Sequence, residues 1–411
     1  PTTTQFLDVW SFSRLESDSP NLVTGDKLFR NYRLVMQKRQ AREEDTDADG
    51  GALKRAKFDP AYALVAVPQT SSALIATSSL DPGRTSSLMT PEVSLLGHEG
   101  AIYSLAFDPS GQHLCSGSFD KQIFLWDVFG ECKNYNILSG HKNAVLQVAW
   151  PTSGSIVSCS ADKTVACWDA NKGVRLRKLV EHAAIVNSCA VAKDVPTSIV
   201  SGSDDCTVIL WDARSKRSVA SIYQDYQVCS VCISSNGQSI YAGGIDNTIR
   251  KFDTRMNSGS VEKNQFQKPE IEFDEPAITL QGHADTITGM ALSPDEHYLL
   301  SNSMDGTLRC WDVRPFAAGE ASGLSRCERI SHGVHHGAEK LLLRCAWSPD
   351  QELVAAGSAD RLVHSWDASN FQPLPCWPGH KASVNEVIFH PKEKIIASCG
   401  SDRQIILGEL P

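Results

Sequence analysis

The amino-acid sequence predicts an all-β chain in which a disordered N-terminal arm precedes a seven-bladed β-propeller. Three observations lead to this prediction. An Asp followed six residues later by Trp recurs along the chain, a His precedes most of these Asp residues by 21 to 25 positions, and short β-rich runs lie between them. Self-similarity at this period is typical of propellers in which each repeat supplies one four-stranded blade. No helical periodicity runs through the copies.

The Asp and Trp positions define the copies. "SIVSCSADKTVACWD" at 155–169 and "SIVSGSDDCTVILWD" at 198–212 are nearly the same fifteen residues, 43 positions apart. Five copies hold both residues: Asp120 with Trp126, Asp162 with Trp168, Asp205 with Trp211, Asp305 with Trp311, and Asp360 with Trp366. Two weaker copies keep the Asp but have Phe252 after Asp246 and Gly408 after Asp402. Successive Trp or Phe positions are 42, 43, 41, 59 and 55 residues apart, so the two long intervals carry insertions.

A loop His precedes the Asp in six copies, and the fourth copy lacks it. These residues are His98, His141, His182, His283, His335 and His380. The indole N–H of a buried Trp needs an acceptor. We therefore expect a second-strand Ser (Ser158 or Ser160 in the second copy), the loop His and the turn Asp to form a hydrogen-bonded chain that ends on the Trp. Such a network stabilises most when every member is satisfied.

The propeller should occupy residues 90–411. Runs such as "AIYSLAFDP", "HLCSGS" and "QIFLWDV", separated by "PSGQ" and "FDK", have the composition of short strands and turns. Gly-His and Trp-Asp marks at this period are the signature of WD40 repeats. The segment "PEVSLL", residues 91–96, belongs to no copy. We expect it to complete the seventh blade beside residues 384–410, which removes two open sheet edges.

Composition excludes several classes of protein. The net charge of −9 gives no overall field that would attract nucleic acid or an anionic membrane. No apolar stretch approaches the roughly 18 residues of a membrane span, and "PTTTQFLDVW" does not resemble a signal peptide. The thirteen Cys are odd in number and many lie in apolar runs, which favours free thiols in a reducing compartment. Cys229 and Cys232 should face opposite sides of one strand, as core residues rather than a metal or redox pair.

The sequence does not predict an enzyme. A catalyst needs one constellation in one pocket, whereas the His, Ser and Asp recur in nearly every copy. No Gly-rich phosphate loop, zinc-type spacing or nucleophile elbow is present. Residues 327–340, "CERISHGVHHGAEK", hold three His and a Cys at irregular spacing with no second ligand pair, and His335 is assigned to the blade-six network. We expect no cofactor, no metal and no small-molecule substrate.

A basic arc is the candidate binding surface. The residue after the turn Asp is basic in blades one, two, six and seven, which are contiguous once the ring closes: Lys121, Lys163, Arg361 and Arg403. Lys142 and Lys381 follow loop His residues and should lie on the same face. Solvated surface charge is the ordinary interpretation. The functional one is docking of an acidic protein segment or of RNA phosphates.

Residues 1–89 carry no repeat. "QKRQAREEDTDADGGALKRAKFD" is charged and poor in aromatic residues, which is typical of a disordered arm. Lys54, Arg55 and Lys57 match a short basic nuclear-import signal, with a solvated charge run as the alternative. Met36 opens a plausible start, so we expect residues 1–35 to be dispensable.

Longer strings are more specific than the repeat marks. The chain contains the strings "FDKQIFLWDVFGECKNY", "MDGTLRCWDVRPF", "EKLLLRCAWSPD" and "SVNEVIFHP", and it lacks the fourth Gly-His and the seventh Trp-Asp. In these features it resembles, over residues 90–411, the WD-repeat subunit of the spliceosomal U5 small nuclear ribonucleoprotein. The insertions 257–276 and 319–325 depart from that family. The resemblance implies a non-catalytic scaffold in the nucleus, acting in pre-mRNA splicing and spliceosome assembly. It implies as partners the large central U5 protein, the U5 GTPase and the U5 RNA helicase, with U5 snRNA nearby.

A second interpretation is a substrate receptor of a cullin-type ubiquitin ligase. "WDAR" at 211–214, "FDTR" at 252–255 and "WDVR" at 311–314 carry the Trp-Asp-x-Arg pattern of such receptors. An Arg after a strand end is also a common solvated residue. Replacing Arg214 and Arg314 with Ala should abolish binding to a ligase adaptor under this interpretation and leave spliceosomal assembly intact under the first.

Overall fold

The computed structural model describes residues 86–152, 154–255, 276–315, 326–337 and 339–410. The predicted arm up to residue 85, with Met36 and the basic residues Lys54, Arg55 and Lys57, lies outside this part of the chain. The insertion 319–325 and all but the last residue of 257–276 lie outside it too. Strands, turns and loops account for the described residues, and none of them forms a helix that could span a membrane.

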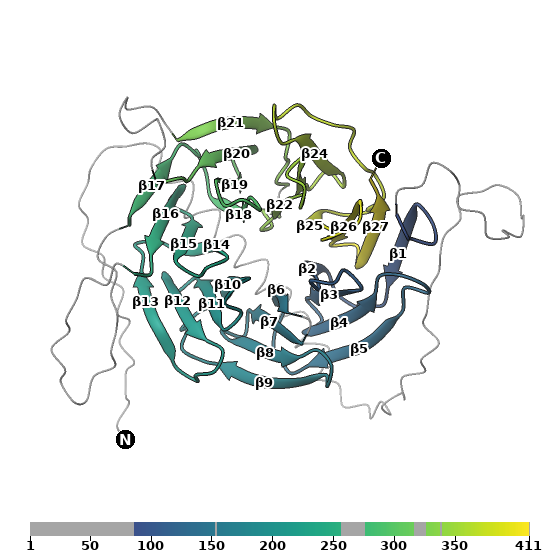
Figure 1. Ribbon diagram of the computed structural model, residues 1–411, viewed down its shortest axis with the longest axis horizontal. Helices are drawn as coiled ribbons and strands as arrows, with labels where there is room; N and C mark the ends of the chain where they lie inside the picture. The colour runs from purple at the N-terminus through teal and green to yellow at the C-terminus, as the bar shows by residue number, and fades with distance from the viewer. Residues whose placement is uncertain (1–85, 153, 256–275, 316–325, 338, 411) are drawn as a thin grey trace, which may run out of the picture. The chain divides into compact units, whose positions relative to one another are not determined.

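Seven antiparallel sheets stand around a central axis, each running from an inner to an outer strand (Figure 1). This arrangement confirms the predicted all-β, seven-bladed propeller. Blade one contains β2 (Ile102–Phe107), β3 (His113–Ser118), β4 (Gln122–Asp127) and β5 (Asn134–Ser139). Blade two contains β6 (Val145–Thr152), β7 (Ser155–Ser160), β8 (Val165–Asp169) and β9 (Val174–Leu179). Blade three contains β10 (Val186–Val191), β11 (Ser198–Ser203), β12 (Thr207–Asp212) and β13 (Ser218–Tyr223).

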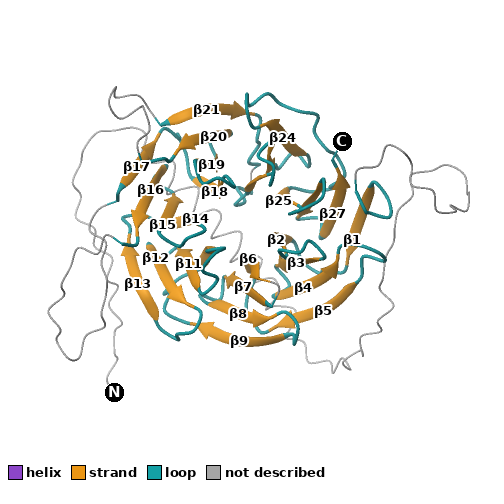
Figure 2. Ribbon diagram, in the orientation of Figure 1, coloured by secondary structure: helices purple, strands orange, loops and turns teal. Residues whose placement is uncertain are grey.

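The remaining four blades follow in chain order (Figure 2). Blade four contains β14 (Val228–Ile233), β15 (Ser239–Gly244), β16 (Thr248–Asp253) and β17 (Ile278–Gln281). Blade five contains β18 (Ile287–Leu292), β19 (Tyr298–Ser303), β20 (Thr307–Asp312) and β21 (Cys327–His332). Blade six contains β22 (Cys345–Trp347), β23 (Leu353–Gly357) and β24 (Val363–Asp367). Blade seven contains β25 (Val384–Phe389), β26 (Ile395–Gly400), β27 (Gln404–Glu409) and β1 (Glu92–Leu96).

The hydrophobic core lies between the blades. Ile123 and Leu138 of blade one pack with Val145 and Trp168 of blade two, and all four side chains are at most 1% exposed. Similar buried clusters join blades three and four, four and five, five and six, six and seven, and seven and one. Both faces of a blade are therefore covered, which explains why the second and third strands of blades one to three are buried along nearly their whole length.

Blade seven closes the ring. Strand β1 pairs antiparallel with β27, from Glu92 opposite Gly408 to Leu96 opposite Gln404. Contacts begin before β1, since the Ser86 N–H donates to Glu409 Oε1 (2.7 Å) and Leu88 is buried against the same blade. Residues 86–89, which we expected to belong to the arm, thus pack on the propeller.

Blade six departs from the four-stranded pattern. The segment at its outer edge forms only two isolated bridges to β24, Val363 with Trp377 and Trp366 with Pro373. Leu374 donates its N–H inward to the Ser365 carbonyl oxygen (2.9 Å). The backbone nitrogens of the alternating residues, Pro373 and Pro375, therefore face outward. Because proline has no N–H, neither can donate to a further strand. The prolines therefore remove outward N–H donors at positions 373 and 375 without disturbing the inward bonds to β24.

A buried ion pair ties the inner strands together. Arg344 precedes β22, is only 5% exposed, and donates from Nη2 to the carbonyls of Leu146 (3.3 Å) and Asn187 (3.0 Å) in blades two and three. Its Nε lies 3.7 Å from Glu386 Oε1 of blade seven. Glu386 in turn accepts the N–H of Leu105 in blade one. Four blades are thus linked to blade six at the ring's centre.

Candidate binding face and the networks beneath it

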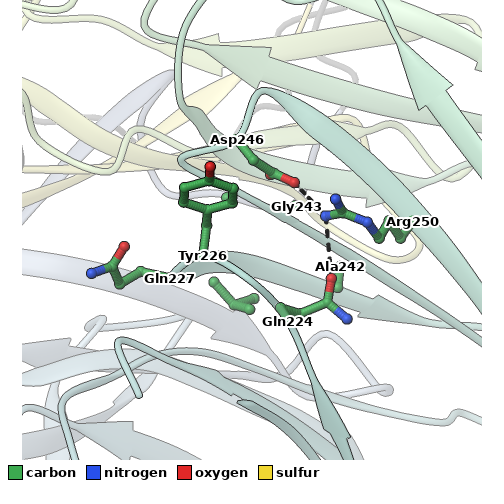
Figure 3. Close-up of a pocket in the computed structure, with 9 residues that line it drawn as sticks. Gln224, Tyr226, Gln227, Ala242, Gly243, Asp246 and Arg250 are labelled. Carbon is green, nitrogen blue, oxygen red and sulfur yellow. Dashed lines mark hydrogen bonds and ion pairs between the residues drawn. The ribbon is translucent and has the colours of Figure 1, made fainter. Parts of the chain in front are cut away.

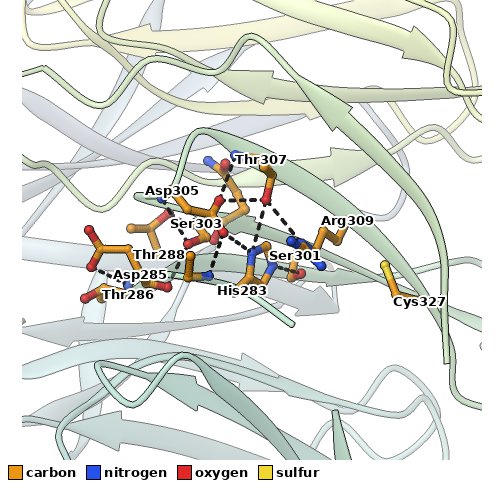
Figure 4. A network of polar contacts seen from close by, with 12 residues as sticks. His283, Asp285, Thr286, Thr288, Ser301, Ser303, Asp305, Thr307, Arg309 and Cys327 are labelled. Carbon is orange, nitrogen blue, oxygen red and sulfur yellow. Dashed lines mark hydrogen bonds and ion pairs between the residues drawn. The ribbon is translucent and has the colours of Figure 1, made fainter. Parts of the chain in front are cut away.

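Blade five holds the complete repeated network, and Figure 4 shows its His283, Ser301 and Asp305. The Trp311 indole N–H donates to Ser301 Oγ (2.8 Å), and Ser301 lies 2.6 Å from His283 Nε2. His283 Nδ1 lies 2.9 Å from Asp305 Oδ2, which also accepts the N–H of Ala284 (2.9 Å). Because the carboxylate only accepts, the protons run from Trp through Ser and His to Asp. The loop before the inner strand is thereby fixed to the turn between the second and third strands.

The same chain is present in blades one, two and three. The Ser Oγ–His Nε2 distances are 2.7 Å for Ser116 with His98, 2.8 Å for Ser158 with His141, and 2.7 Å for Ser201 with His182. The His Nδ1–Asp distances are 2.7 Å to Asp120, 3.1 Å to Asp162, and 2.9 Å to Asp205. The distances from the indole Nε1 to the Ser Oγ are 2.9 Å for Trp126, 2.8 Å for Trp168, and 2.7 Å for Trp211. Of the two serines left open by the sequence, Ser158 is the network member.

Blade seven keeps the chain without its last link. His380 lies 3.0 Å from Asp402 and 2.9 Å from Ser398 Oγ, and Gly408 stands where the other blades have Trp. The network therefore does not need the indole to hold loop and turn together.

In blade four a polar hollow replaces the network (Figure 3). Gln224 stands at the loop His position, Ala242 at the Ser position and Phe252 at the Trp position. Arg250, four residues after Asp246, bonds to the Asp246 carboxylate and donates to Gln224 Oε1 (3.2 Å). The hollow is lined by Gln224, Ala242, Asp246 and Arg250, among others, and has an empty volume of about 180 Å³ that includes open solvent.

Blade six also departs from the expected network. The ring of His335 is exposed, and what contacts the blade is its backbone, whose N–H donates to Ser358 Oγ (3.1 Å). His364, four residues after Asp360, takes the carboxylate instead, with Nε2 2.7 Å from Asp360 Oδ2. The reason is local: Ala356 replaces the network Ser, so an inserted His335 ring would meet no hydroxyl group. The prediction that His335 is the network His of blade six is therefore wrong, and His364 takes that role toward Asp360.

The basic arc lies on the turns that these carboxylates hold. Lys121, Lys163, Arg361 and Arg403 are all exposed, and their φ angles are 72°, 69°, 75° and 68°. The same left-handed position holds Cys206, Asn247 and Gly306 in blades three to five. Only Gly, and to a lesser degree Asn and Asp, adopt this conformation at little cost. The long basic side chains are therefore not selected by the backbone of the turn.

Two more members of the arc come from the loops. Lys142 donates its N–H to Asp162 (2.9 Å) and Lys381 donates to Asp402 (2.8 Å), which places both beside the turn residues of their blades. Both side chains are exposed. Blade one has Glu99 at the equivalent position, so the arc of six basic residues includes one exposed acid.

Comparison with known proteins decides the family. A repeat profile described as "WD domain, G-beta repeat" matches residues 89–127, 132–169, 173–212, 217–253, 274–312, 330–367 and 371–407. The chain is 43% identical over 328 residues to the U5 small nuclear ribonucleoprotein 40 kDa protein of Dictyostelium discoideum, covering 80% of this chain and 86% of that protein. It is 45% identical over 330 residues to the Homo sapiens protein of that name, with the same coverage. The Schizosaccharomyces pombe "Pre-mRNA-splicing factor cwf17" is 39% identical over 328 residues, 80% of this chain and 90% of that protein.

The chain belongs to the U5 40 kDa family of WD-repeat proteins. Each WD repeat is offset from the blades by one strand, because the match 132–169 holds the outer strand β5 of blade one and then β6, β7 and β8 of blade two. Every repeat therefore spans two blades, and the ring closes only when β1 supplies the outer strand of blade seven.

The arginines of the Trp-Asp-x-Arg pattern have local partners in this WD-repeat protein. Arg214 Nη2 lies 2.7 Å from Asp212 Oδ2, Arg255 Nη2 lies 2.7 Å from Asp253 Oδ2, and Arg314 Nη2 lies 2.5 Å from Asp312 Oδ2. The Arg214 side chain is nevertheless 77% exposed. Each Arg thus closes the turn after the third strand.

The cysteines are free thiols, ten of them buried. Cys229 and Cys232 both lie in β14 and are buried. Among the described residues, no group of three or more His, Cys, Asp and Glu side chains is arranged to hold a metal ion, the described part of 327–340 included.

The network should make stability fall in acid. Burial acts to raise the pKa of Asp162, Asp205 and Asp305, but hydrogen bonds from His, Thr and backbone N–H groups outweigh it and hold these pKa values well below the usual range. A carboxyl group with a lowered native pKa contributes its full stabilisation above its unfolded pKa of about 3.9. That contribution is lost progressively as pH falls from this value toward the lower native pKa. Burial lowers the pKa of His283 in the folded protein. Below about pH 6.5 the unfolded chain therefore binds a proton on this His more readily than the folded protein does, which lowers the free energy of unfolding.

We therefore expect the thermal midpoint to decline gently below about pH 6.5 and steeply below about pH 4. Calorimetry or circular dichroism at constant ionic strength measures it. An Asp305→Asn variant serves as the control, since its midpoint should start lower and fall less steeply in the acid range. A midpoint that is flat or rises down to pH 4 would contradict this account.

Proposed function

We propose that this WD-repeat protein is a non-catalytic scaffold of the U5 small nuclear ribonucleoprotein that acts in pre-mRNA splicing in the nucleus. The observation that carries the proposal is 43–45% identity to proteins named as U5 40 kDa components over 80% of the chain. A propeller is suited to such a role because its two faces and its rim can hold several partners at once.

The partners proposed are other spliceosomal proteins: the large central U5 protein, the U5 GTPase and the U5 RNA helicase, with U5 snRNA close by. The basic arc is the proposed docking surface for an acidic protein segment or for RNA phosphates. Its support is that six exposed basic side chains gather on neighbouring blades of a chain whose net charge is −9. Against an acidic background, such a patch attracts anionic surfaces selectively.

Charge reversal tests the arc. Changing Lys121, Lys163, Arg361 and Arg403 to Glu should weaken co-purification with U5 proteins and RNA at least ~10-fold, while the melting temperature stays near that of the parent. The turn itself does not require these side chains, so binding should be lost without unfolding. The readout is a tagged pull-down from nuclear extract with RNA and proteins both identified.

The matched control reverses four exposed basic residues on turns at the opposite ends of the strands: Lys172, Lys216, Arg217 and Lys394. This variant has the same net charge as the arc variant, so a general charge effect would weaken both. Equal recovery of U5 components with the arc variant and the parent would dismiss the arc. Recovery of a cullin adaptor without small nuclear RNA would instead favour the ligase-receptor interpretation.

A further inference from the structure

One thiol at the rim of blade six differs from the other twelve. Cys376 is exposed, whereas Cys206 and Cys327 are half-buried and the remaining cysteines are buried. It lies between Pro375 and Trp377 in the segment that replaces the outer strand, so its backbone neighbours the middle of β24.

A histidine faces this thiol. Cys376 Sγ lies 3.4 Å from Nδ1 of His364, which projects from β24. The other ring nitrogen, Nε2, lies 2.7 Å from Asp360 Oδ2 in the preceding turn. The imidazole is 15% exposed and stacks on Trp366, with ring centroids 6.0 Å apart and planes at 21°. Two partners and a stacked ring therefore fix its orientation.

The hydrogen bond to Asp360 decides which nitrogen is basic. The pKa of Asp360 is lowered, because hydrogen bonds from His364 and the Leu362 N–H outweigh the raising effect of burial. Asp360 is therefore an acceptor, and Nε2–H of the neutral ring donates to it. That leaves the lone pair of Nδ1 directed at the Cys376 thiol. A base held by a third group beside a nucleophile is the general arrangement by which thiols are activated.

We propose that Cys376 is a base-assisted thiol and a site of covalent modification by small uncharged electrophiles, with hydroperoxides as the oxidant class. With hydrogen peroxide, the sulfur attacks one oxygen and the O–O bond breaks. His364 Nδ1 accepts the thiol proton and passes it to the departing oxygen. The products are a sulfenic acid on Cys376 and one water, so sulfur is oxidised by two electrons and peroxide is reduced by two.

The surroundings select the kind of electrophile. Partial burial and the nearby Asp360 carboxylate raise the pKa of the Cys376 thiol, so it is protonated at neutral pH and depends on His364 for proton removal. The same carboxylate repels anionic reagents. Cys206 is the matched comparison, because it is half-buried and both burial and the neighbouring Asp205 and Asp204 raise its pKa. Its sulfur faces the Asp204 carbonyl oxygen (3.9 Å) where that of Cys376 faces a His.

The test uses the reduced full chain. It is treated with hydrogen peroxide in the presence of dimedone, which traps sulfenic acids, and each cysteine is quantified by peptide mass spectrometry. Cys376 should be trapped at least ~10-fold faster than Cys206. His364→Gln should lower the rate at which Cys376 is trapped by about 10–100-fold. This range is lower than that typical of general-base catalysis in enzymes, because no active-site pocket encloses the reagent here. Alkylation by iodoacetamide should follow the same order.

Asp360→Asn provides a second variant that keeps the ring but weakens its orientation, and it should slow Cys376 less than His364→Gln does. Melting curves show which variants are folded, and the Cys206 rate within each sample reports any general loosening. Trapping of Cys376 at the rate of Cys206, or a rate unchanged in both folded variants, would overturn the proposal.

Discussion

Arg344→Met should destabilise the propeller by about 3–5 kcal/mol at neutral pH, the cost typical of removing one partner from a buried ion pair. Arg344 is 5% exposed, and Glu386, whose carboxylate faces its guanidinium, is 6% exposed. Without Arg344, Glu386 would keep its charge in an apolar centre, and the carbonyls of Leu146 and Asn187 would lose a charged donor. Urea unfolding followed by circular dichroism measures the loss.

The loss should depend on pH in a definite direction. Burial already raises the pKa of Glu386, against the opposing effect of Arg344. A carboxyl group with a raised native pKa contributes to folding stability fully below its unfolded pKa of about 4.3. That contribution is lost as pH rises through the native pKa. The deficit of Arg344→Met should therefore be larger at pH 8 than at pH 5.

The double variant Arg344→Met/Glu386→Gln is the matched control, since it removes both charges. It should recover much of the stability that Arg344→Met loses, because an ion pair replaced as a whole often costs little. A double variant whose loss equals the sum of the two single losses would show that the charges do not interact across the ring.

Ser301→Ala should have an effect of similar size. Ser301 is fully buried and joins two groups, so its loss leaves both the Trp311 N–H and His283 Nε2 without a partner. At about 1–3 kcal/mol for each unsatisfied buried group, we expect the two groups together to cost about 2–6 kcal/mol. Thermal and urea unfolding of the purified chain measure it.

Blade four supplies the control for this prediction. It already holds Gln224, Ala242 and Phe252 where blade five has His283, Ser301 and Trp311, and both blades carry Arg four residues after the Asp. The triple variant His283→Gln/Ser301→Ala/Trp311→Phe should lose less stability than the three single variants summed, because Arg309 can then reach Asp305 as Arg250 reaches Asp246. Additive losses would contradict the exchange of one network for the other.

The repeat network could largely be predicted from the sequence, because its members lie at fixed spacing within one copy. The same spacing misled at His335, because the sequence left two second-strand positions open for the network Ser, and in blade six these are Ala356 and Ser358. Only the fold shows that the network uses the first of them, where Ala356 has no hydroxyl group. His364 carries no repeat signal. It occupies a strand position that holds Phe124 in blade one and Arg309 in blade five, so only the fold shows that it meets Asp360.

The centre of the ring could not be predicted. Arg344 and Glu386 stand at the inner-strand position that holds Ser104, Gln147 and Ser188 in blades one to three. Nothing within one copy shows that these positions converge. A charged residue would ordinarily be assigned to the surface, and the contacts of Arg344 with blades two and three join residues 198 and 157 positions apart. Pairing at such separations follows from ring closure alone.

The pairing of β1 with β27 also sets a timetable for synthesis. Ser86 and Glu409, which are bonded in blade seven, are 323 positions apart. At about 5–20 residues per second, the ribosome needs roughly 16–65 s to make the intervening chain. During that interval β1 has no partner and the apolar flank of blade one has no neighbour. The nascent chain must therefore be shielded by a chaperone, or it will expose an open strand and an uncovered core to its neighbours on the polysome.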